Sequence, residues 1–139
     1  MKLALDAKLK SDLPAILKRY PAVRSAYVFG STAIGRQHQL SDVDIGLRID
    51  DRLSAEGAFD LKLKLAEELE TLFGSRVDVV ILNTASLQMI HQAISGGRLL
   101  YATEPDAERD FYIRKRKAYF DFKYTLRKDR AALHAFFDR

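Results

Sequence analysis

The chain contains no cysteine among its 139 residues, so disulfides and thiolate catalysis are both excluded. It has no apolar run of 18 residues, which argues against a membrane-spanning helix. Charged residues interrupt the first 13 positions, a pattern that does not fit a signal peptide. The sequence also lacks GxxxxGK[ST], which excludes a P-loop. These absences are typical of a cytoplasmic protein, and the size predicts one hydrophobic core.

Positive charge is concentrated at the C-terminal end. Residues 109–139 carry 10 Lys and Arg against 4 Asp and Glu, whereas residues 1–108 carry 13 against 15. A basic segment can bind an anionic partner, or it can simply be a solvated helix face. The charges alone do not decide between these readings.

Hydrophobic periodicity predicts short strands alternating with helices. Strands are expected at 25–30, 42–49 and 76–82, with a further edge strand at 98–102. Helices are expected at 9–20, at 53–74, where Ser54 can cap the start and Gly74 the end, and from Asn83 or Thr84 to Ile94. The remainder from Pro105 is expected to be largely helical. We therefore predict an α/β (α+β) fold: a small mixed sheet with helices packed on one face and a helical C-terminal tail.

Two aspartates in the second strand indicate a metal site. Asp42 and Asp44 are two residues apart, so both side chains point to the same face of the strand. Carboxylates held this close repel, and a divalent cation removes the conflict. Asp78 lies among valines in the next strand, where an unpaired charge would be costly, and it can approach Asp44 if those strands pair. Three carboxylates around two cations suit phosphoryl transfer.

A phosphate-binding turn precedes these aspartates. Gly30 ends the first strand and lets backbone N–H groups approach a phosphate, while the hydroxyl of Ser31 adds a donor. Arg36 could neutralise triphosphate charge. Each feature also has a structural alternative: an ordinary turn for Gly30-Ser31, a turn cap for Asp42, and pairing of Asp78 with Arg76 or Arg98.

The combination of Gly30-Ser31, ten residues, and Asp42-Val43-Asp44 resembles the nucleotidyltransferase superfamily that includes DNA polymerase β. The short chain is similar to the minimal nucleotidyltransferases encoded beside HEPN-domain partners, over about residues 10–102. The resemblance implies that Gly30 and Ser31 hold the triphosphate of ATP. It also implies that Asp42, Asp44 and Asp78 bind two Mg²⁺ ions. Residues 1–104 would form the nucleotidyltransferase domain and residues 105–139 a basic, mostly helical extension.

The resemblance further implies an antitoxin that transfers AMP to a hydroxyl, with tyrosine expected, of a cognate HEPN ribonuclease toxin in a hetero-oligomer. Two alternatives stay open: a drug-type enzyme acting on small molecules, and an antitoxin that neutralises by binding alone. A membrane partner is not expected. The run "RKRK" at 114–117 could contact nucleic acid, but adjacent basic residues spread around a helix and make a dedicated groove less favoured.

Overall fold

A computed structural model describes residues 7–30 and 43–138 of the chain, and it contains one mixed four-stranded sheet in the order β3-β2-β1-β4. The strands are β1 (Val23–Phe29), β2 (Val43–Ile49), β3 (Val77–Ile81) and β4 (Arg98–Ala102). Strand β1 pairs antiparallel with β2 and β4, whereas β2 and β3 run parallel. The predicted mixed sheet and its edge strand at 98–102 are confirmed.

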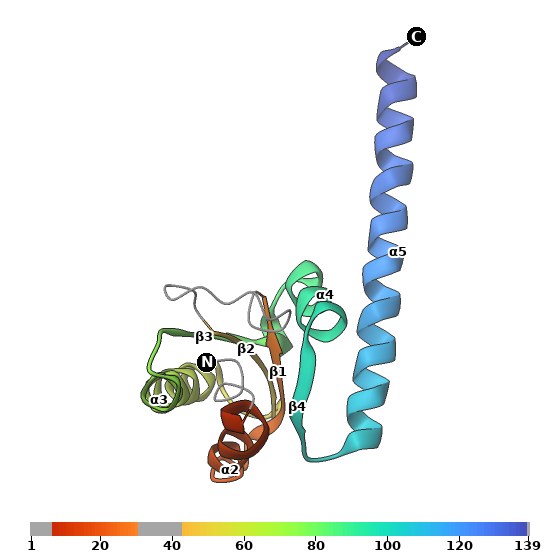
Figure 1. Ribbon diagram of the computed structural model, residues 1–139. Helices are drawn as coiled ribbons and strands as arrows, with labels where there is room; N and C mark the ends of the chain where they lie inside the picture. Colours follow the sequence, from red (N-terminus) through yellow and green to blue (C-terminus); the bar gives the residue numbers. More distant parts are fainter. Residues whose placement is uncertain (1–6, 31–42, 139) are drawn as a thin grey trace.

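Helices precede and connect these strands (Figure 1). A short segment η1 (Lys8–Asp12) leads into α2 (Leu13–Leu17), and α3 (Ala55–Phe73) connects β2 to β3. The turn η2 (Leu82–Thr84) and helix α4 (Leu87–Gly96) follow β3, and α5 (Pro105–Phe137) ends the described chain. None of the helices in these ranges combines the length and apolarity needed to cross a bilayer.

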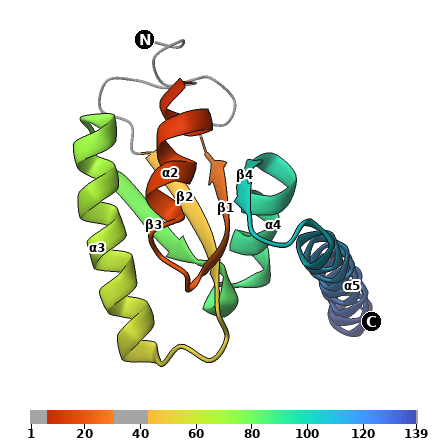
Figure 2. The same cartoon turned by 90° about the horizontal axis from the view of Figure 1, so that it is seen from below.

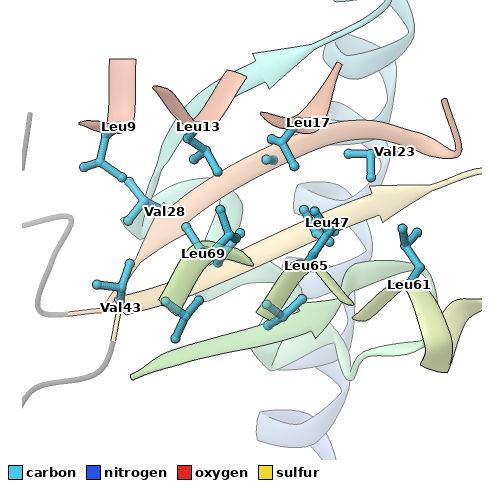
Figure 3. Packing of buried hydrophobic residues seen from close by; sticks show 14 of the residues in the cluster. Leu9, Leu13, Leu17, Val23, Val28, Val43, Leu47, Leu61, Leu65 and Leu69 are labelled. Carbon is cyan, nitrogen blue, oxygen red and sulfur yellow. The ribbon is translucent and has the colours of Figure 1, made fainter. Parts of the chain in front are cut away.

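The main core lies between one face of the sheet and the helices α2 and α3 (Figures 2 and 3). The strict alternation in β2 sends its apolar residues to this face, where they meet a leucine stripe of α3. The buried residues of this core include Leu9, Leu13, Leu17, Val43, Ile45, Leu47, Leu61, Leu65 and Leu69.

A second, smaller core lies on the opposite face, beneath α4 and the first turns of α5. It joins Tyr27 and Phe29 of β1 to Ile90 and Ile94 of α4 and to Phe111 of α5. The predicted fold class is therefore confirmed, with one addition. Helices α2 and α3 cover one face as expected, and α4 also packs against the other.

The ends of α3 agree with the sequence, but the start of α4 does not. The Ser54 hydroxyl accepts a hydrogen bond from the Gly57 N–H, and Gly74 closes α3 in the left-handed conformation. Asn83 does not begin α4. Its side chain instead bridges to the backbone of Ile49 and to Asp51, at 2.7–2.9 Å, and Ser86 caps α4. The predicted start at Asn83 or Thr84 was therefore a few residues too early.

Candidate active site

Asp44 and Asp78 are neighbours on adjacent strands. The parallel register of β2 and β3 pairs their Cα atoms directly, so the two side chains leave the sheet on the same face. That face is opposite to the one covered by α2 and α3, because Val43 and Ile45 on either side of Asp44 point into the main core. The predicted approach of Asp78 to Asp44 is confirmed at the level of strand register.

The two carboxylates differ in their exposure to water. Asp44 is partly buried, whereas Asp78 is exposed, because β3 lies at the edge of the sheet. The expectation that Asp78 would be a costly charge among valines was wrong: Val77 and Val79 are buried on the other face. An exposed carboxylate beside a partly buried one can meet ligands arriving from solvent.

Gly30 lies against Asp44 at the end of β1. Its neighbour Phe29 pairs with Asp44 across the antiparallel ladder. The φ of Gly30 is +72°, and a Cβ built there would lie 2.3 Å from Oδ2 of Asp44. The left-handed backbone favours glycine at this position, and any side chain there would displace the Asp44 carboxylate. The turn after β1 therefore starts directly beside the carboxylate.

Three of the predicted site residues, Ser31, Arg36 and Asp42, lie outside the described residues. Within residues 7–30 and 43–138, no three acidic or histidine side chains are grouped closely enough to hold a metal. Asp44 and Asp78 nevertheless supply two carboxylates on one face, which is the donor chemistry that Mg²⁺ prefers alongside water and phosphate oxygens. Asp44 and Asp78, the two candidate carboxylates within the described residues, therefore fit such an ion.

A cavity of about 610 Å³ extends from Asp78 along β3. It is lined by β3, by the segment after β2 and by the first half of α3, including Phe59 and Lys62. Its volume falls within the range of small-molecule sites. It provides room for an incoming group beside Asp78.

A buried polar network lies on the same face of the sheet as Asp44. Glu108 of α5 accepts hydrogen bonds from the Tyr27 hydroxyl and from Nε of Arg48, the latter at 2.7 Å. The Glu108 residue is only 2% exposed. Burial, and then the hydrogen bond to Glu108, raise the pKa of Tyr27 far above its ordinary value. No local pattern in the sequence predicts this network, because Glu108 lies 60 residues from Arg48.

Comparison with known proteins agrees with this geometry. Residues 11–106 match the family described as polymerase beta, nucleotidyltransferase. The chain belongs to this nucleotidyltransferase family.

Two similar proteins carry names that describe an adenylyltransferase and a toxin–antitoxin. The chain is 36% identical over 88 residues to the protein adenylyltransferase MntA of Shewanella oneidensis, covering 63% of this chain and 60% of that protein. It is also similar to a crystal structure of a toxin–antitoxin with AMP-PNP, with 28% identity, a TM-score of 0.68, and coverage of 91% of this chain and 95% of that chain.

A third match concerns the fold alone. It is a structure of tri-AMPylated Shewanella oneidensis HEPN toxin in complex with MNT antitoxin, at 24% identity and a TM-score of 0.63. The match covers 97% of each chain. The architecture of this nucleotidyltransferase, with its long last helix included, therefore recurs in such complexes.

Proposed function

We propose that this protein is a Mg²⁺-dependent nucleotidyltransferase that transfers AMP from ATP to a hydroxyl group of a cognate HEPN toxin, with tyrosine as the expected acceptor. It would act as the antitoxin of that toxin, in a cytoplasmic hetero-oligomer. The pairing of Asp44 with Asp78 on one sheet face, with Gly30 against Asp44, is the observation that carries this proposal. The names of the relatives indicate transfer of AMP to a protein and a toxin–antitoxin pair.

Gly30 and Ser31 would hold the triphosphate, with Arg36 neutralising part of its charge. Asp42, Asp44 and Asp78 would bind two Mg²⁺ ions. When bound, these ions neutralise the charge on the phosphates and lower the barrier to displacement at phosphorus. The close approach of Gly30 to Asp44 keeps the phosphates beside the carboxylates, so positioning accounts for much of the catalysis.

Asp78 would receive the acceptor. Its side chain is exposed at the edge strand β3, so a tyrosine hydroxyl can reach it from solvent. The hydroxyl oxygen attacks the α-phosphorus, its proton passes to the Asp78 carboxylate, and the bond to pyrophosphate breaks. The products are an AMP ester on the acceptor and free pyrophosphate.

The proposal is tested by incubating the protein with labelled ATP, Mg²⁺ and the HEPN protein encoded beside it, followed by intact mass measurement of both chains. We expect the HEPN protein to gain one or more AMP units. Asp44→Asn should lower the rate by about 100-fold or more, because it removes the charge of a carboxylate that would hold Mg²⁺ at the reacting phosphates. Asp60→Asn, an exposed position on α3, is the matched control and should retain activity.

Two other results would contradict this proposal in different ways. A stable complex without AMP transfer, formed equally by the Asp44→Asn variant, would indicate neutralisation by binding alone. Absence of both complex and transfer, with label appearing on a small hydroxyl compound, would indicate a drug-type enzyme.

A further inference from the structure

Helix α5 contacts the domain mainly along its first half, and its buried residues lie near its N-terminus. Glu108 and Phe111 are its buried residues, and they contact the sheet through Arg48 and Tyr27 and through the smaller core. Further along, Tyr119 stacks on His91 of α4 with ring centroids 3.7 Å apart. Beyond Phe120 every described residue of α5 is exposed. The part of α5 beyond Phe120 therefore projects from the domain (Figure 1).

The projecting part of α5 extends past the end of the sheet at which β1 finishes, where Gly30 and Asp44 lie. Ala102, just before α5, pairs with Ser25 near the start of β1, whereas Gly30 lies at the opposite end. Strand β1 has seven residues, about 23 Å, whereas the 33 residues of α5 span about 50 Å. Figure 1 shows α5 rising past β4 and α4 and continuing well beyond the sheet. A partner bound to distal α5 would therefore extend beyond the end of the sheet at which β1 finishes, and it would reach Gly30 and Asp44 from the side of the sheet where α5 lies (Figure 2).

An apolar stripe continues along α5 from its anchored turns. At about 100° per residue, Phe122, Leu126, Leu133 and Phe137 fall on the side of the helix that Glu108 and Tyr119 occupy lower down. All four are exposed, Leu133 by 58% and Phe137 by 73%. The helix thus uses one face to pack onto its own domain and leaves the continuation of that face open.

The stripe begins at a cationic hollow between α4 and α5. This cavity of about 470 Å³ is lined by the apolar or aromatic residues His91, Tyr119, Phe120 and Leu126 and by the cations Lys123, Arg127 and Arg130. No acidic residue lines it. Burial, and then the charges of Arg116 and Lys123, lower the pKa of His91, so its ring stays neutral and stacked near neutral pH. The hollow is suited to an acidic side chain flanked by apolar ones.

We propose that the distal half of α5, residues 119–137, is the docking surface for the HEPN toxin, which contacts the stripe with apolar side chains and places a carboxylate in the hollow between α4 and α5. The toxin is held next to the Gly30 and Asp44 edge, where its acceptor can reach Asp78. This assignment rests on the proposed function for the identity of the partner. It does not depend on catalysis.

The toxin is favoured over a second copy of this chain on two grounds. The similar solved chain comes from a toxin–antitoxin crystal structure and aligns over 91% of this protein, so most of α5 has a counterpart in a protein of a toxin–antitoxin pair. The cations around the hollow would also repel a second basic α5, since residues 109–139 carry 10 Lys and Arg against 4 Asp and Glu.

The test is a binding titration of the full-length protein with the HEPN protein, without ATP, so that docking is measured apart from transfer. Leu126→Glu combined with Leu133→Glu places charges in the stripe and should raise the Kd at least about 100-fold. The matched control, Ala131→Glu with Ala135→Glu, adds the same charges to the opposite side of the helix and should leave the Kd within about threefold. Circular dichroism confirms that both variants keep their helix.

The outcomes of this titration test the docking surface independently of AMP transfer. Loss of binding in the stripe variant alone supports the docking surface, even if no AMP is transferred by the wild-type protein. Equal binding by both variants overturns it. A self-associating wild-type chain that the stripe variant converts to a monomer, with toxin binding retained, also overturns it and assigns the stripe to a second copy.

Discussion

Gly30 combines a left-handed backbone with a close approach to a carboxylate. Gly74 shares the first property, with φ of +67°, but a Cβ there would meet nothing within 4 Å. A substitution at Gly74 would therefore introduce backbone strain alone, whereas a substitution at Gly30 would introduce strain and also crowd Asp44. This difference makes them a matched pair for substitution.

Gly30→Ala should abolish AMP transfer, because the new methyl group must displace Asp44 from its position, in addition to about 1 kcal/mol or more of backbone strain. Gly74→Ala should lower the free energy of unfolding by a similar strain term and leave transfer unchanged. Chemical denaturation and single-turnover transfer rates measure the two effects. Equal activity of the two variants would contradict the close approach at Gly30.

Tyr27 should affect stability in a pH-dependent way. Tyr27→Phe removes a buried donor to Glu108, and we expect it to lower the free energy of unfolding by about 1–3 kcal/mol near neutral pH. Because the folded state raises the pKa of Tyr27 above the unfolded value of about 10, the tyrosine's contribution is complete below pH 10 and is lost above it. The difference between wild type and variant should therefore shrink from pH 9 to 11 in urea titrations. A constant difference across that range would contradict this assignment.

At the scale of elements, the sequence predicts the features that depend on neighbouring residues, such as the face of a strand and the ends of a helix. The alternation in β2 predicts that Asp44 faces away from the main core, and the parallel β2–β3 connection predicts its approach to Asp78. Ser54 and Gly74 bound α3 because capping is local. Asn83 and Glu108 could not be assigned in this way. Their partners lie 34 and 60 residues away in sequence, at Ile49 and Arg48, and only the folded chain brings them together.

At the scale of the whole molecule, the division between domain and extension at residue 104 stays a prediction. The burial of Glu108 and Phe111 suggests that the first turns of α5 are needed for stability. Arg48 would lose its carboxylate partner without them, at a cost of about 3–5 kcal/mol. The distal part of α5 makes no comparable contribution to either core.

Two truncations test this division. Ending the chain after Lys123 keeps Tyr119 on His91 and should leave the melting temperature within a few degrees of the wild-type value, while toxin binding is lost. Ending it after Glu104 should unfold the domain or lower its melting temperature by about 10 °C or more, since several kcal/mol are removed. Thermal melts and the binding titration measure both effects. A stable, toxin-binding chain of 104 residues would contradict the role assigned to α5.

The hydrogen bond between Tyr27 and Glu108 joins residues 81 positions apart, and this separation has a consequence for synthesis. Strands β1 and β2 are made early, but the smaller core cannot close until Phe111 is available. A nascent chain therefore exposes apolar surface beside the carboxylates until the start of α5 has emerged from the ribosome. Incomplete chains should be preferred substrates of cellular proteases, and the helix that completes the fold is the same helix to which we assign the partner.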